Sequence, residues 1–307
     1  MIDFKHPTLE DRQWAEDILF QMGTRSCEDT FLVLYTWQHA YGIRIARMGD
    51  FLIGYMSGAH GTAYLYPMGR GDVRPVIEAL HEDAKERGAL PLRLICVTPE
   101  MQKTLDETFP GRFTYQSDRD SFDYVYAIDK LCDLTGKKLQ SKRNHINRFV
   151  QNFPDWSAEP VTGENIAQCL EVERRWQIDA AADTVAGSEE EEDQKDEDVA
   201  LHTAMREFDA LGLEGILIHA GGKPVAFALG KQVSADSYNI HFEKADANIQ
   251  GSYAIVNREY ARWIRDHYPT VQWINREDDM GVEGLRKAKE SYHPDFLIEK
   301  HTAFWQE

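Results

Sequence analysis

The sequence has few of the features that mark exported, membrane or disulfide-rich proteins. No window approaches eighteen uninterrupted apolar residues, and no basic segment followed by an apolar one opens the chain, so neither a membrane span nor a secretion signal is expected. There are four widely spaced cysteines and no C-x-x-C pair: Cys27, Cys96, Cys132 and Cys169. This spacing argues against a zinc knuckle or a disulfide framework and favours a reducing compartment. We therefore expect a cytoplasmic protein.

Positive charge is also scarce. The 34 Lys and Arg residues face 52 Asp and Glu residues, which gives a net charge of -18 and a pI near 5.0. Non-specific coating of nucleic acid needs a broad basic surface, so that class of function is excluded, whereas a local basic pocket for a phosphate-bearing ligand is not. The 42% hydrophobic and 28% charged residues are typical of a folded globular protein. A chain of 307 residues is long enough for two domains.

Hydrophobic periodicity predicts the same order of elements twice. Each half begins with helices, continues with three antiparallel strands, and then alternates helices with strands. We therefore predict an α/β (α+β) fold of two tandem domains over residues 1–130 and 131–307, each a mixed, mostly antiparallel sheet flanked by helices. Two apolar stretches carry a more local prediction. Phe31–Trp37 fits a strand or a buried helix equally well, and residues 296–304 fit one final strand.

A basic segment at residues 136–149 opens the second half. If it is helical, Lys138, Lys142 and His145 share one side. Lys142 and Arg143, with His145, would then cradle a phosphate or a polynucleotide backbone. The alternative is a surface helix with a solvated cationic face.

An acidic run follows at residues 188–198, where eight carboxylates accompany one lysine. A metal site would need acids held at a fixed geometry, which a continuous run does not provide. We expect a solvated loop and no metal.

A further candidate lies at His241–Ala245 and the loop after it. Strand alternation predicts that His241 and Glu243 point to the same face. Gln250-Gly251 then precedes a long helix that the apolar periodicity predicts over Ser252–His267. A glycine at a helix start lets backbone N–H groups approach a phosphate. An ordinary helix entry explains the glycine equally well.

The stretch Asn275–Pro294 concentrates charge where a predicted strand leads into a helix. Ligands of open α/β sheets usually bind at such junctions. Acids at the start of this helix and bases at its end complement its dipole, which a plain surface helix would also show. The dipole does not account for Arg276 and Glu277. Arg286 and Lys289 share a face and form a candidate anion clamp.

Two long motifs together resemble a known family. Residues 123–131 (Asp-Tyr-Val-Tyr-Ala-Ile-Asp-Lys-Leu) and the basic segment at 134–149 resemble its central signature, and residues 275–294 resemble its C-terminal one. His241-Phe-Glu-Lys-Ala245 matches between them. The family is the bacterial group related to the catalytic C-terminal domain of phosphatidylglycerol lysyltransferases. The resemblance covers essentially the whole chain and implies two tandem domains of the N-acetyltransferase (GNAT) fold, akin to the FemABX aminoacyl transferases.

The resemblance implies an acyl- or aminoacyltransferase. Lysyltransferases of this type pass an aminoacyl group from a charged tRNA to a lipid headgroup. The implied donor is acyl-CoA or an aminoacyl-tRNA, with tRNA as a partner and without a permanently bound cofactor. The implied acceptor is the amine or hydroxyl of a small molecule or lipid headgroup. This chain lacks the multi-helix membrane portion of the lysyltransferases. It also has only Gln250-Gly251 in place of the Gln/Arg-x-x-Gly-x-Gly/Ala loop of acetyl-CoA enzymes.

The hypothesis assigns a role to each candidate residue. Glu243 or Glu277 would deprotonate the acceptor, and Tyr292 would protonate the leaving group. The residues predicted to bind the donor or its anionic groups are Lys138, Lys142, Arg143, His145, Gln250, Gly251, Arg276, Arg286 and Lys289. The rest of the site wall is predicted to comprise His241, Asn275 and Asp279. The N-terminal copy is predicted to be structural, because no comparably charged junction follows its strand at residues 92–97.

The alternative is a module that has kept the fold and lost catalysis. It would bind a nucleotide, tRNA or an acidic metabolite. The oligomeric state stays open at this stage.

Overall fold

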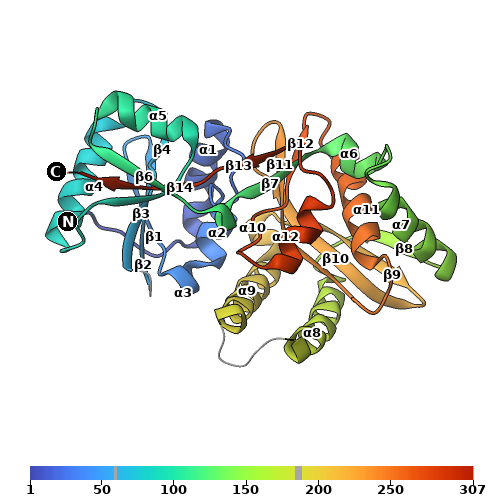
Figure 1. The fold of residues 1–307 in the computed structure, drawn as a ribbon. Helices are drawn as coiled ribbons and strands as arrows, with labels where there is room; N and C mark the ends of the chain where they lie inside the picture. The colour runs from blue at the N-terminus through green and yellow to red at the C-terminus, as the bar shows by residue number, and fades with distance from the viewer. Residues whose placement is uncertain (59–60, 184–188, 307) are drawn as a thin grey trace. The chain divides into compact units, whose positions relative to one another are not determined.

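The computed structural model describes residues 1–58, 61–183 and 189–306, which form two compact units (Figure 1). The first unit comprises Met1–Asp123, Asp278–Val282 and Leu297–Glu307. The second comprises Tyr124–Glu277 and Glu283–Phe296. Within the described ranges, no helix is both long and apolar enough to cross a membrane.

The first unit is built around one seven-stranded sheet. Its strands are β1 (Arg44–Met48), β2 (Phe51–Gly58), β3 (Gly61–Leu65), β4 (Met68–Gly69), β5 (Arg93–Val97), β6 (Phe113–Ser117) and β14 (His301–Trp305). Its helices are η1 (Leu9–Asp11), α1 (Arg12–Met22), α2 (Phe31–Thr36), α3 (Gln38–Tyr41), α4 (Arg74–Glu86), α5 (Pro99–Thr108) and η2 (Arg119–Ser121).

The second unit is built around another seven-stranded sheet. Its strands are β7 (Asp123–Ala127), β8 (Ser157–Pro160), β9 (Glu214–Ala220), β10 (Lys223–Gln232), β11 (Ser237–Ala245), β12 (Trp273–Asn275) and β13 (Phe296–Ile298). Its helices are α6 (Ile128–Asp133), α7 (Gln140–Asn152), α8 (Ile166–Asp183), α9 (Glu189–Arg206), α10 (Phe208–Leu211), α11 (Ser252–His267) and α12 (Glu283–Glu290).

The two sheets share one strand pattern. The first has the order β1-β2-β3-β5-β14-β6, and the second has β8-β9-β10-β11-β12-β7-β13. In each, three antiparallel strands meet one parallel neighbour, at β3/β5 and β11/β12, and the following strand is antiparallel again. The predicted α/β fold of two similar units, each with a mixed sheet and flanking helices, is confirmed.

The two copies exchange a strand. β14, from the C-terminus, lies between β5 and β6 of the first sheet, and β7 lies between β12 and β13 of the second. Figure 1 draws β14 in dark red beside β6. Residues 297–307 and 278–282 therefore belong to the first unit, although the sequence placed all of 131–307 in one domain. The single strand expected at 296–304 is instead β13 and β14, in different sheets. Strand partners of this kind are far apart in the chain, so local patterns do not reveal them.

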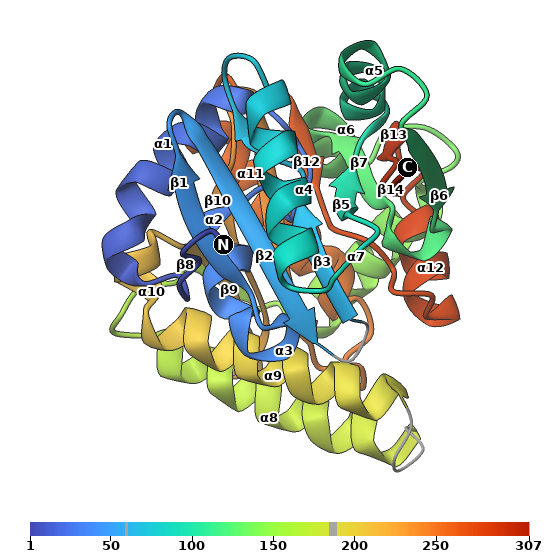
Figure 2. The ribbon, with the colours of Figure 1, turned by 90° about the vertical axis from the view of Figure 1, so that its left-hand side faces the viewer.

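Two local predictions are settled in favour of helix. Phe31–Trp37 forms α2, which begins where the Thr30 hydroxyl accepts a hydrogen bond from the Val33 N–H at 3.2 Å. The acidic run is not a loop, because its described part lies in α9, and Ser188 lies outside the described residues. Acids near a helix start favour the helix dipole. Figure 2 shows α9 beside α8, and Gln177 donates a hydrogen bond to Asp198 between them.

Helix α11 covers the central strands of the second sheet and has the bounds predicted from its periodicity. Ile255, Tyr260 and Ile264 on its inner face are fully buried. The Tyr260 hydroxyl bonds the Tyr238 hydroxyl of β11 at 2.9 Å and donates to the Glu214 carbonyl of β9 at 2.8 Å. These contacts hold β11 rigidly against the helix.

Candidate active site

A β-bulge in β11 sets the direction of the site side chains. Ile240 lies opposite Gly230 of β10 and Phe242 lies opposite Leu229, so His241 is an extra residue in its strand. Gly230 permits the bulge, because a Cβ there would lie 2.2 Å from a carbonyl oxygen of β11.

The bulge changes the alternation along β11. Tyr238 faces α11 through Tyr260, and Glu243 also faces α11, where its Oε2 accepts a hydrogen bond from Asn257 Nδ2 at 3.4 Å. In a regular strand, residues five apart point to opposite faces. The extra residue at His241 therefore turns Glu243 towards α11.

The strands β11 and β12 separate at the same place. They pair only over Ser237–Asn239 and Trp273–Asn275, while β11 continues to Ala245. The chain after β12 is instead hydrogen-bonded to Tyr124 of β7. The Arg276 N–H donates to the Tyr124 carbonyl at 3.0 Å, and the Tyr124 N–H donates to the Glu277 carbonyl at 3.1 Å. The side chains of Arg276 and Glu277 then reach back to β11.

Glu277 and His241 form a hydrogen-bonded pair. His241 Nδ1 lies 2.7 Å from Glu277 Oε1, and the imidazole side chain is only 2% exposed. An ionised carboxylate can only accept, so Nδ1 donates to Glu277, and in the neutral imidazole Nε2 is then the nitrogen with the lone pair. Nε2 is buried and has no hydrogen-bond partner in the part of the chain that the structure describes.

The backbone at Glu277 is strained and held. Its φ is 60°, a left-handed conformation that costs a residue with a side chain about 1–3 kcal/mol. The Glu277 N–H donates to Oδ1 of the fully buried Asn275 at 2.6 Å, and its carbonyl accepts from Tyr124. These bonds fix the carboxylate that orients His241.

A cationic cluster lies beside Glu243. Arg276 Nη2 donates to Glu243 Oε1 at 2.9 Å, and its Nη1 is buried with no partner among the described residues. Its guanidinium carbon lies 4.9 Å from the Tyr292 ring centroid and 5.9 Å from that of Tyr126. Lys142 Nζ lies 4.0 Å from the same Tyr292 centroid.

The cluster shifts the pKa of both basic groups. Burial, and next the charge of Arg276, lowers the pKa of Lys142 to about 8, and Glu243 opposes this. Burial acts to lower the pKa of Arg276, but Glu243, Tyr126 and Tyr292 outweigh it and raise that pKa. Arg276 therefore stays charged, while Lys142 loses its proton more readily than an ordinary lysine.

The three side chains predicted to transfer protons are held in other contacts. Both oxygens of Glu243 have partners, so this carboxylate is committed to Arg276 and Asn257. Burial raises the pKa of Tyr292, which makes it a weaker acid for a leaving group, and its ring instead faces Lys142. The Glu277 carboxylate is engaged by His241.

The basic segment does not present the predicted cationic face. Lys138 is exposed and precedes α7, so it shares no helix face with Lys142. The Arg143 guanidinium bonds the carbonyls of Leu134 and Gly136, at 2.8 Å for the latter, and so closes the loop before α7. His145 is exposed.

Gly251 lies close to the backbone of α7. Its φ is 92°, and an added Cβ would lie 2.5 Å from the His145 carbonyl oxygen. The glycine thus lets α11 begin against α7, and the phosphate approach expected there finds no support. Gln250 is exposed and accepts a hydrogen bond from Arg148 at 3.1 Å.

The remaining predicted residues divide between the units. Arg286 and Lys289 lie half-buried on α12, and Lys289 Nζ lies 6.0 Å from the Tyr124 ring centroid. Asp279, predicted for the same wall, belongs to the first unit, where it is fully buried and pairs with Arg119 at 3.5 Å.

Lys244, the next β11 residue after Glu243, enters a second buried cluster. Its Nζ lies 2.8 Å from Glu197 Oε2 and 3.4 Å from the Trp176 ring centroid, on α9 and α8 respectively. Nearby Glu173 is 2% exposed, and its Oε2 has no partner in the described chain. Burial, opposed by Lys244, raises the pKa of Glu173 to about 7.

Sequence reasoning missed Asn257, Tyr126 and Glu173. The signal for Asn257 was a polar residue on the apolar face of α11, between Val256 and Tyr260. Tyr126 lies in the motif at residues 123–131, but the motif gave it no role. No sequence signal pointed to Glu173, because its partners lie on other elements.

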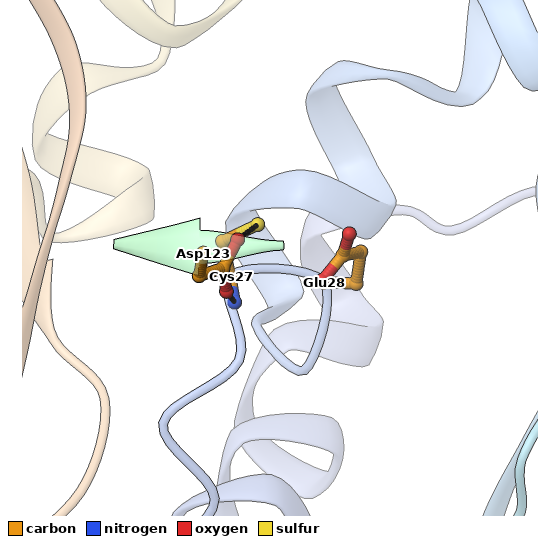
Figure 3. A group of neighbouring side chains, drawn as sticks. All are labelled: Cys27, Glu28 and Asp123. Carbon is orange, nitrogen blue, oxygen red and sulfur yellow. Dashed lines mark hydrogen bonds between the residues drawn. The ribbon is translucent and has the colours of Figure 1, made fainter. Parts of the chain in front are cut away.

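The first unit holds a separate charged cluster. One side-chain atom each of Cys27, Glu28 and Asp123 lies within 4.8 Å of the other two. Figure 3 shows these three side chains. Lys300 Nζ already lies among them, 2.5 Å from Glu28 Oε1, 2.7 Å from Asp123 Oδ1 and 3.5 Å from Cys27 Sγ. The buried ammonium thus supplies the positive charge that this acidic group requires.

A cavity of about 460 Å³ also lies in the first unit, against α1 and β1. Its basic lining residues Arg47 and Arg70 already donate to backbone carbonyls, at 3.0 Å and 2.8 Å. No buried polar group there lacks a partner among those that the structure describes.

Comparison with known proteins assigns the chain to a family. The profile of the C-terminal region of phosphatidylglycerol lysyltransferases matches residues 20–304. The chain belongs to this family. The family resemblance expected from the two long motifs is therefore confirmed.

Solved structures share the fold of this chain. A conserved protein of unknown function from Bacteroides thetaiotaomicron is 38% identical, with full coverage of both chains and a TM-score of 0.92. The C-terminal domain of a putative lysylphosphatidylglycerol synthetase from Agrobacterium fabrum has 16% identity, a TM-score of 0.68, and coverage of 97% of this chain and 92% of that one. FemX, at 10% identity and a TM-score of 0.64, covers 98% of this chain and 97% of its own. The last two show a shared fold.

One curated relative is an uncharacterised protein from Mycoplasmoides gallisepticum. It is 25% identical over 183 residues, which are 59% of this chain. The match spans about half of that relative, 55% of its length.

Proposed function

We propose that this protein is an aminoacyltransferase whose second unit carries the reaction. The observation that supports this most strongly is the His241–Glu277 pair, with the imidazole oriented by a carboxylate and Nε2 unpartnered and buried among the described residues. The family name refers to lysyl transfer, and FemX shares the fold. Acyl transfer needs a base of this kind, which takes a proton from the acceptor as it attacks the donor ester.

The proposed step follows from the bonding of the pair. Nε2 of His241 accepts the proton of the attacking amine or hydroxyl, and the new bond forms at the ester carbonyl of the donor. Glu277 stabilises the imidazolium through Nδ1–H. The ester C–O bond of the donor then breaks, and the imidazolium gives its proton to the departing oxygen, which leaves as a hydroxyl. Glu277 acts here as the residue that positions the base, and Glu243 holds Arg276.

The donor we propose is an aminoacyl-tRNA or another activated aminoacyl ester. Its discharge is measured with a labelled pool of mixed aminoacyl-tRNAs, in the presence of a panel of small amines and alcohols. Acyl-CoA is tested in parallel. We expect acceptor-dependent loss of the aminoacyl ester with the wild-type protein and at least a hundredfold slower loss with His241→Gln.

The matched control is His267→Gln, which changes an exposed histidine at the end of α11, outside the pair. Its rate should equal that of the wild type. If the wild type discharges none of the donors, the proposal is contradicted and the alternative of a binding module is favoured. A His241→Gln rate equal to wild type would reject the proposed base.

A further inference from the structure

The cluster beside the proposed base has an unmet positive charge. Arg276 and Lys142 are two cations, and the carboxylate of Glu243 acts on both. The guanidinium side chain is 12% exposed, and its Nη1 lacks a partner within the described ranges. Buried polar groups are nearly always hydrogen-bonded, so an unpartnered charged donor indicates a missing acceptor.

The two cations also repel each other. Both lie against the ring of Tyr292, with Lys142 Nζ 4.0 Å and the Arg276 guanidinium carbon 4.9 Å from its centroid, and the charge of Arg276 lowers the pKa of Lys142. Burial removes the water that would screen this repulsion. An anion that contacts both cations would offset the repulsion and accept the free N–H.

The donors that remain favour phosphate over carboxylate. A carboxylate is bound best by the planar fork of an arginine, but Nη2 of this arginine is already taken by Glu243. What remains is Nη1 and, on another element, the compact ammonium of Lys142. Tetrahedral phosphate oxygens suit such separate donors, and lysine binds phosphate as a point charge.

We infer that Arg276 and Lys142 form a binding site for a phosphate group of a substrate, beside the His241–Glu277 pair. This inference rests on the proposed function for the identity of the substrate, but not for the binding itself. The phosphate belongs either to a nucleotide part of the donor or to the headgroup of a phosphate-bearing acceptor. Glu243 then acts by fixing the guanidinium so that Nη1 faces the ligand.

The test is a titration of the full-length protein with inorganic phosphate, followed by calorimetry and thermal shift. Sodium acetate at equal ionic strength is the carboxylate probe. We expect phosphate to bind the wild type and its dissociation constant to rise at least tenfold in Lys142→Met. Lys142→Met leaves the Arg276–Glu243 pair intact and so avoids an unpaired buried carboxylate.

Arg276→Gln is the second variant and should abolish phosphate binding. Lys138→Met, an exposed lysine outside α7, is the matched control and should bind like the wild type. Adenosine monophosphate then represents the nucleotide part of the donor, and glycerol 3-phosphate represents the acceptor headgroup. The compound that binds more tightly identifies the source of the phosphate. Either preference supports the site.

Three results would overturn the inference. They are no phosphate binding by the wild type, equal binding by Lys142→Met and Lys138→Met, or acetate binding as tight as phosphate. The measurement involves no transfer, so it can fail while aminoacyl transfer is observed. It can also succeed in a protein that transfers nothing.

Discussion

Removing the charge of Glu173 should stabilise the protein at neutral and alkaline pH. Its carboxyl is 2% exposed, and burial raises its pKa from the ordinary 4.5 to about 7. Between these values the folded state binds more protons than the unfolded state, so stability falls as pH rises. At about 1.4 kcal/mol per pKa unit, ionising Glu173 lowers the unfolding free energy by about 3 kcal/mol, and this loss is complete above pH 7.

Glu173→Gln keeps the shape of the side chain and removes the titration. Urea unfolding at pH 5, 6, 7 and 8 should show the wild type losing about 2–3 kcal/mol relative to the variant across this range. Glu171→Gln, an exposed glutamate on the same helix, is the control and should parallel the wild type. Parallel curves for the wild type and Glu173→Gln would refute the reasoning, since they would mean that Glu173 has no pH-dependent cost in the folded state.

Two further substitutions test the packing that supports the units. Lys300→Met leaves Glu28 and Asp123 without their ammonium and should cost about 3–5 kcal/mol of unfolding free energy in urea; a loss below 1 kcal/mol would contradict the described pairing. Gly251→Ala should lower the melting temperature more than Gly222→Ala, because both have positive φ but only Gly251 would place a Cβ 2.5 Å from a carbonyl. Equal losses would show that backbone conformation alone matters.

Much of the fold follows from local pattern. The periodicity of α11, with buried residues such as Ile255 and Ile264, gave its bounds directly, and the repeated order of elements predicted two similar units. What failed was non-local. The exchange of β7 and β14 between the sheets depends on which strand edges meet after folding, and no residue in either strand signals its partner.

The candidate site was predicted in part for the same reason. Charge at the end of β12 drew attention to Arg276 and Glu277, but their partners depend on the bulge at His241. The sequence cue for that bulge was Gly230, a glycine within an apolar strand. Its role becomes clear only from the structure, where a β11 carbonyl leaves no room for a Cβ. Asp279 was misplaced because the chain crosses into the first unit one residue after Glu277.

The account's central claim is that His241 and Glu277 act as one unit in aminoacyl transfer. The most direct test is single-turnover discharge of an aminoacyl-tRNA by the wild type, His241→Gln, Glu277→Gln and the double variant. We predict that each single change slows transfer by about 10²–10⁴-fold, and that the double variant is no slower than His241→Gln alone. A wild-type rate in Glu277→Gln, or losses that multiply in the double variant, would contradict the claim.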